Sequence, residues 1–161
     1  MGNDITVYVS ALEDSLRSKE VVLKRLLELT ERQGVVLQEK MDTDEFDRLM
    51  QEKEICIVRI QELDKGFDNL FNRIGVALKA NKEQYQVRIL QMQDAIQRIT
   101  DLSVKVQTAE KRNKELFIAF VSGKRKEIRD FKKSNKTAVS YYQNMANQHH
   151  EWQTYFLDKK K

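Results

Sequence analysis

Residues 44–74 read DEFDRLMQEKEICIVRIQELDKGFDNLFNRI, and the spacing of the apolar side chains in this stretch decides the fold. Those side chains recur at steps of three and four, at Phe46, Leu49, Cys56, Ile60, Leu63, Phe67, Leu70 and Ile74. Lys53 is the one polar interruption of the stripe. Such spacing keeps one face of a helix turned toward partner helices over many turns. A helix of this length, about 45 Å, is not stable alone with a single apolar stripe. The rest of the chain must therefore supply the helices that cover it.

The composition indicates the same fold class. The chain of 161 residues has no proline and only five glycines, so no point in it is forced out of a helix. Charged residues make up 34% and aromatic residues 8%, a mixture typical of helical bundles and coiled coils. We therefore predict an all-α fold, with an antiparallel helical hairpin and a longer third helix that form a three-helix bundle or coiled coil. An amphipathic C-terminal helical segment follows, and residues 1–161 are expected to form one elongated domain.

The pattern predicts helices over residues 4–38, 43–74 and 82–134, and the amphipathic segment over residues 137–157. The first helix has a broad apolar stripe, which favours contact with two neighbouring helices rather than one. The connection between the first two helices is short, so they should be antiparallel neighbours. We expect Asp4 to cap the start of the first helix, because its carboxylate can accept a backbone N–H there.

Several positions mark expected helix ends and weak points. Asp42 followed by Glu45 has the spacing of a capping box at the start of the second helix. Gly75 is expected to end or break that helix, and Gly34 to mark either a weak point or a close approach in the first helix. In the third helix the apolar stripe thins near Asn113, where we expect poor or solvated packing.

The sequence lacks the known motifs for catalysis and for binding of cofactors or metals. It has no glycine-rich phosphate loop, no nucleophile elbow and no HExxH motif, so we expect no catalytic residues, no enzymatic activity and no cofactor. His149 and His150 are adjacent and would point about 100° apart on a helix, so no metal site is expected. Cys56 lies on the apolar stripe, where buried packing is expected rather than a reactive thiol. No apolar run approaches the ~18 residues of a membrane span, so no membrane insertion is expected.

The charge is unevenly distributed along the chain. Residues 1–110 carry an acidic excess and residues 111–161 a basic one. Nucleic acid, anionic lipid or an acidic protein surface would each explain this basic third of the chain. Within it, the basic run at residues 124–136 could bind phosphates. Glu127 and Asp130 dilute its lysines and arginines, and no nucleic-acid recognition motif accompanies it. We interpret it as a solvated charged face and expect no nucleic-acid partner.

The C-terminal segment carries the strongest candidate for a binding surface. Residues 137–150 have no charged side chain, in a chain that is otherwise rich in charge. The candidate partner-binding residues are spaced along one broad helical face, at Ala138, Tyr141, Tyr142, Met145, Trp152, Tyr155 and Phe156. Aromatic residues and methionine are enriched where proteins bind one another. Two interpretations stay open: the face binds a partner, or it packs back on the bundle as a fourth helix.

Several segments resemble the FlgN-like flagellar export chaperones. They are the leucine-rich arm ending at residues 33–37, the run EKEICIVRIQELDKGF at residues 52–67, the run AEKRN at residues 109–113, and Tyr141-Tyr142. The resemblance covers most of the chain. It implies a bacterial, cytoplasmic helical chaperone of the flagellar type III export system. Such a chaperone would hold hook-associated (hook–filament junction) proteins unassembled through its C-terminal amphipathic segment and bring them to the export apparatus.

Two other functions fit the helical pattern. One is a structural coiled-coil scaffold, and the other is the related chaperone of the filament cap, which shares the helical hairpin. Long helices with few packed contacts can exchange between protomers, so a homodimer or a domain swap is also compatible with the sequence.

Overall fold

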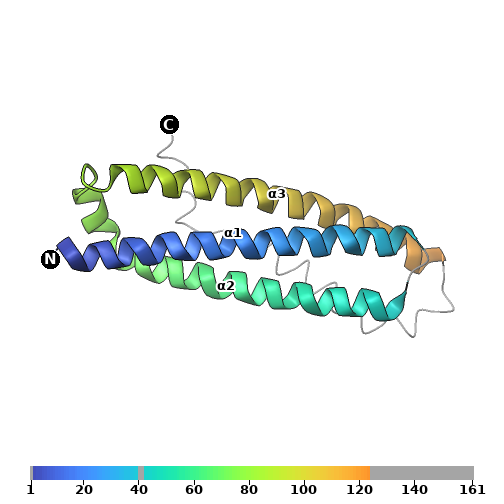
Figure 1. Cartoon of the computed structure of the whole chain (residues 1–161). Coiled ribbons are helices and arrows are strands. Elements are labelled where there is room, and N and C mark those ends of the chain that lie inside the picture. Colours follow the sequence, from blue (N-terminus) through green and yellow to red (C-terminus); the bar gives the residue numbers. More distant parts are fainter. Residues whose placement is uncertain (1, 40–41, 124–161) are drawn as a thin grey trace.

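The structure, a computed structural model, describes residues 2–39 and 42–123, with side chains from Ile5 onward. The described residues form three helices, α1 (Gly2–Gln38), α2 (Thr43–Ala80) and α3 (Gln86–Gly123). The helices lie side by side in an elongated bundle, with α2 antiparallel to α1 and α3 running in the same direction as α1 (Figure 1). No strand occurs within the described ranges. The predicted all-α bundle is confirmed.

Helix α1 is the one against which the other two pack. The close backbone approaches are those of α1 with α2 and of α1 with α3, and Figure 1 shows α1 between them. The heptad frame of α1 is buried throughout, at Ile5, Val9, Leu12, Leu16, Lys19, Leu23, Leu26, Thr30, Gln33 and Leu37. The broad stripe therefore contacts two neighbours, as predicted. Asp4 is not the N-cap, because α1 already begins at Gly2.

Asp42 caps the start of α2 as predicted, but the Glu45 side chain bonds to Arg32 instead of completing the predicted capping box. Asp42 is the N-cap residue, and its carboxylate accepts hydrogen bonds from the backbone N–H groups of Asp44 and Glu45. The acidic residues of this first turn also complement the helix dipole. The Glu45 carboxylate pairs with Arg32 of α1 at 2.6 Å. The turn between α1 and α2 is thus tied to both helices.

Gly75 neither ends nor breaks α2, and the prediction of a helix end there was wrong. The helix continues to Ala80, where the amide N–H of Asn81 bonds to the carbonyl oxygen of Ala77. A glycine inside a helix costs only about 1 kcal/mol relative to alanine. Burial of Leu78 beyond the glycine stabilises the continued helix by more than that.

Helix α3 begins at Gln86, later than the predicted start at residue 82, because turns occupy residues 81–85. Tyr85 is buried there, with its hydroxyl 2.8 Å from Oγ1 of Thr6. The described part of α3 has 38 residues, the same number as α2. Residues 124–134 of the predicted third helix lie outside the described residues, as does the segment 137–157. A third helix longer than the others therefore stays a prediction.

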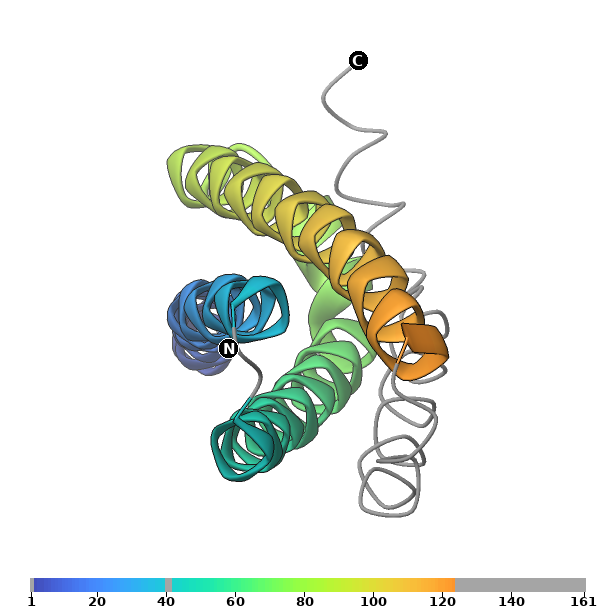
Figure 2. The same ribbon diagram turned by 90° about the vertical axis from the view of Figure 1, so that its right-hand side faces the viewer.

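Large side chains bridge α3 to α2, because α3 runs obliquely across the hairpin (Figure 2). The rings of Phe46 and Phe117 stack at a centroid distance of 5.6 Å and an interplanar angle of 9°. This contact joins the beginning of α2 to the end of α3. Gly123, after which the C-terminal segment follows, therefore lies at the same end of the bundle as the turn between α1 and α2 (Figure 1).

Candidate functional site

The residues predicted to bind a partner lie outside the described residues. They are Ala138, Tyr141, Tyr142, Met145, Trp152, Tyr155 and Phe156. Their role stays a prediction. The described helices contribute three other features that bear on function: a buried polar layer, a second buried ion pair and a small hollow between α1 and α3.

Five polar side chains from all three helices meet inside the bundle, and we call this set the polar layer. Its members are Thr30 and Gln33 of α1, Lys53 of α2, and Glu110 and Asn113 of α3. Each is at most 3% exposed. The poor or solvated packing expected near Asn113 was a wrong prediction, because these polar groups are sealed from water and bonded to one another.

Lys53 lies at the centre of the polar layer. Its Nζ donates hydrogen bonds to Oε1 of Glu110 and, at 2.5 Å, to Oε1 of Gln33. Oγ1 of Thr30 lies 2.9 Å from the same oxygen of Glu110. Nδ2 of Asn113 donates to the carbonyl oxygen of Thr30 at 2.7 Å. A buried charge is tolerated only when it is paired and hydrogen-bonded, and these contacts satisfy that condition for Lys53.

The electrostatics of the layer show the cost of enclosing these charges. Burial lowers the pKa of Lys53, and the attraction of Glu110 opposes this shift without cancelling it. Transfer of each ion out of water costs several kcal/mol, which the attraction between the ions repays only with good geometry. The pair of Lys53 and Glu110 therefore contributes more to the alignment of α2 and α3 than to the net stability of the fold.

Gly34 allows the close approach of α1 and α3 beside the polar layer. A Cβ atom at this position would lie 2.8 Å from Oδ1 of Asn113 and 3.1 Å from Nη2 of Arg112. A contact under 3.0 Å requires one of the neighbours to shift. Of the two roles expected for Gly34, the close approach is the one found.

A second buried ion pair joins α1 to α2 away from the polar layer. Nζ of Lys19 lies 2.6 Å from Oδ1 of Asp64, and both side chains are buried. Both polar groups occupy positions where the helix turns an otherwise apolar face toward its neighbour. Both buried lysines of the described residues thus meet a carboxylate from another helix.

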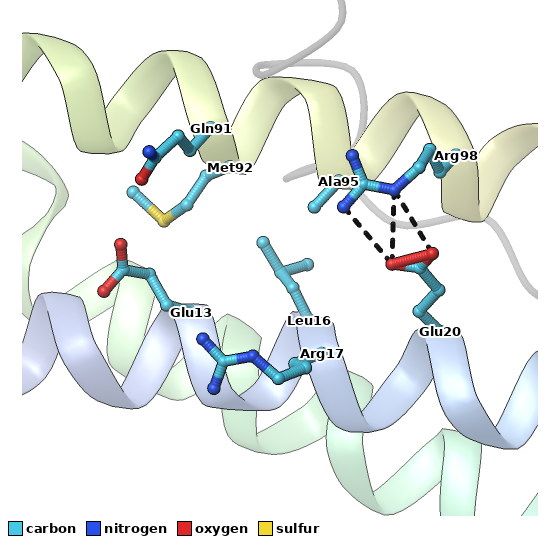
Figure 3. A pocket seen from close by; sticks show the side chains of 8 residues that line it. All are labelled: Glu13, Leu16, Arg17, Glu20, Gln91, Met92, Ala95 and Arg98. Atoms are coloured by element: carbon cyan, nitrogen blue, oxygen red, sulfur yellow. Dashed lines mark hydrogen bonds and ion pairs between the residues drawn. The ribbon is translucent and has the colours of Figure 1, made fainter.

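A hollow of about 150 Å³ lies between α1 and α3 and is shown in Figure 3. Leu16 points into it from α1, and Met92 and Ala95 line it from α3. Its rim is charged, but Arg98 donates to both carboxylate oxygens of Glu20, as the dashed lines in Figure 3 mark.

The remaining rim charges of the hollow are paired as well. Arg88 donates to both carboxylate oxygens of Glu13, and this hydrogen bonding raises the pKa of Arg88 above its usual range. Arg17 pairs with Asp14 at 2.7 Å. Ligand pockets usually enclose about 300–1,000 Å³. We interpret the hollow as a small packing space between two helices that ion pairs hold together, rather than as a ligand site.

The outer face of α2 carries three exposed apolar side chains, Ile55, Val58 and Val76, none of which belongs to the predicted apolar stripe. Ile55 is 70% exposed and Val58 is 49% exposed. They line a shallow surface hollow together with Glu54, Arg59 and Glu62. Scattered exposed apolar residues are normal on protein surfaces, so this face carries no assignment by itself.

The described ranges hold neither a cluster of metal ligands nor a membrane-spanning helix. Among the described residues, no three His, Cys, Asp or Glu side chains gather where they could hold a metal ion. None of the described helices is long and apolar enough to cross a membrane. Cys56 is buried, as expected from its place on the stripe, and burial raises the pKa of its thiol.

The fold and these contacts define an elongated bundle of three helices whose buried charges are paired between helices. A family model described as FlgN protein matches residues 1–149. The chain belongs to this FlgN family of flagellar export chaperones, and the resemblance found in the sequence is confirmed. Neither a curated protein nor a solved structure matches the chain.

Proposed function

We propose that this protein is a bacterial cytoplasmic chaperone that binds flagellar hook-associated proteins of the hook–filament junction. It holds them unassembled and delivers them to the flagellar type III export apparatus. The observation that carries this proposal is the match of the FlgN family model to residues 1–149. Binding of export substrates is what the family implies, and the choice of junction proteins is the proposal's own.

The proposed binding surface is the C-terminal face that includes Tyr141, Met145, Trp152 and Phe156. Its spacing of three and four residues would let it lie as an amphipathic helix along a helical end of the substrate. Filament-type subunits assemble through such helical ends, so a chaperone that covers the same surface would block premature assembly. Large aromatic side chains dominate the energetics of interfaces, which is why Trp152 and Phe156 are the proposed anchors.

The surface of the described bundle is a second argument for placing the binding surface in the C-terminal segment. Most of its large apolar side chains pack in the core, and the rim charges of its hollow between α1 and α3 are paired. A substrate helix needs an apolar groove or an amphipathic helix to bury against. The uncharged face of residues 138–156 meets that need.

The test is isothermal titration of a junction protein into the full chain and into variants. Deletion of residues 138–161 is expected to abolish binding while the helicity and melting of the bundle stay nearly intact. The double variant Trp152→Ala, Phe156→Ala should weaken binding by about 2 kcal/mol or more, the usual cost of removing interface anchors. A matched control, Gln143→Ala with Asn147→Ala, truncates polar side chains that helical spacing puts on the opposite face of the same segment, and it should leave the affinity within threefold.

Three outcomes would contradict parts of the proposal. Undiminished affinity after the deletion would move the binding site onto the helical bundle. Collapse of the whole fold after the deletion would make the segment a structural fourth helix. Light scattering that shows self-association of the chain, and no complex with the junction protein, would favour a scaffold instead.

A further inference from the structure

The two halves of α3 are held to the hairpin by different chemistry. In the first half the buried positions are mostly apolar, with Met92, Ile96 and Ile99. In the second half, residues 106–123, two of the four buried positions are the polar residues Glu110 and Asn113. Apolar burial is non-directional, whereas a buried polar group is stable only while its specific partners stay in place. The second half therefore docks well in one arrangement only.

The polar layer defines that arrangement. A slip of α3 by one turn would bring Val106 or Lys114 to the place of Glu110, opposite Lys53. The first would leave the ammonium group beside an apolar side chain, and the second would set two cations against each other. Either is costly in a buried site.

Gly34 adds a second restriction on the same alignment. The Cα of this glycine faces Asn113, and any side chain at position 34 would meet the Oδ1 atom at less than normal contact distance. The layer and the glycine therefore leave the second half of α3 with a docked state and an undocked state, and few states between them.

We propose that the polar layer is a latch, and that residues 106–123 of α3 undock from the hairpin as a unit while the first half of α3 stays in place. Two observations and one general argument support this. The unit contacts α2 through long side chains, Glu110 with Lys53 and Phe117 with Phe46. Oδ1 of Asn113 accepts no hydrogen bond among the described residues. The buried ion pair between Lys53 and Glu110 adds little net stability to the docked state, because the cost of desolvating both charges offsets their attraction.

Undocking would change where the chain leaves the bundle. The C-terminal segment follows directly after Gly123, so the latch sets the position from which that segment starts. This inference does not depend on what the segment binds.

Native-state hydrogen exchange of the full chain, read by mass spectrometry, tests the latch. In the wild type, peptides from residues 106–123 are expected to exchange about tenfold faster or more than peptides from residues 90–100, since locally opening units exchange ahead of global unfolding. Lys53→Met leaves Glu110 without its cation and should widen this difference by about another tenfold. Uniform protection along α3 in the wild type would overturn the proposal.

Two further variants separate the latch from a general loss of stability. Lys19→Met breaks the other buried pair, which does not involve α3, and should raise exchange without widening the difference between the two halves. The double variant Lys53→Met, Glu110→Leu replaces the pair by apolar groups and should slow exchange of residues 106–123 below the wild-type rate. A double variant that exchanges as the wild type does, or a Lys19→Met variant that widens the difference equally, would also overturn the latch. Because the double variant keeps an apolar core, it gives a result even where Lys53→Met does not fold.

Discussion

Phe67 of α2 is one of the largest fully buried side chains among the described residues. It is 1% exposed and its ring packs against that of Phe71, with centroids 6.4 Å apart. Phe67→Ala should lower the free energy of unfolding by about 3–5 kcal/mol, because it removes a large apolar group and leaves a cavity. Urea denaturation followed by circular dichroism measures this. Val58→Ala on the outer face of the same helix is the control, and its effect should stay within about 0.5 kcal/mol. Equal effects of the two changes would contradict the assigned core face.

Cys56 offers a chemical measure of burial at the same scale. Burial raises the pKa of its thiol, and thiolate is the reactive form. Labelling by a thiol reagent at pH 8 should therefore be slow in the folded protein and fast in urea. The folded state also keeps the thiol proton at a pH where the unfolded chain has lost it. As the pH rises through about 8.5, the pKa of an ordinary cysteine, the wild type should lose stability relative to Cys56→Ala. Fast labelling of the folded protein, without urea, would show that this stretch of α2 is exposed.

At the scale of the element, two glycines inside helices should respond in opposite directions to the same change. A Cβ at Gly66 would have no atom within 4 Å, so Gly66→Ala should stabilise α2 by about 0.5–1 kcal/mol. A Cβ at Gly34 would meet Asn113, which its hydrogen bond to the carbonyl oxygen of Thr30 holds in place. Gly34→Ala should therefore destabilise the protein by about 1–3 kcal/mol, as overpacking does. Thermal unfolding of both variants decides the signs. A stabilising Gly34→Ala would mean that Asn113 moves aside freely.

The helices themselves were predictable from the sequence, because the three- and four-residue spacing is a local property of the chain. What the spacing could not show was the outcome of contacts between helices. Gly75 is a weak helix former. Helix α2 continues beyond it because neighbouring residues such as Leu78 are buried in the bundle. Glu110 and Asn113 interrupt the stripe of α3, and their partner Lys53 interrupts that of α2. The pairing of the two interruptions depends on which residues face one another in space, and sequence periodicity contains no such information.

Polar residues on a heptad frame were nevertheless a usable signal. Lys19, Thr30 and Gln33 occupy frame positions of α1, and all three are buried. Since an unpaired buried charge is rarely tolerated, each lysine on a frame predicts a carboxylate across the interface. For Lys19 that carboxylate is Asp64, and for Lys53 it is Glu110. The C-terminal binding face lies beyond the described residues, so its prediction still rests on the sequence pattern.

At the scale of the whole molecule, α1 carries the contacts to both other helices, and the pair between Lys19 and Asp64 joins it to α2. Lys19→Met leaves the Asp64 carboxylate buried without its cation and should cost about 3–5 kcal/mol of stability. The double variant Lys19→Met, Asp64→Leu should be nearly as stable as the wild type or more so, because apolar groups of similar size avoid the cost of desolvating two charges. Arg17→Ala is the control: it breaks an ion pair with Asp14 in which both side chains are exposed, and it should cost less than about 1 kcal/mol. Urea denaturation of the three variants gives these differences directly. If Lys19→Met cost no more than Arg17→Ala, the lysine would have to reach water in the folded state, and the close packing of α1 on α2 at this level would be wrong.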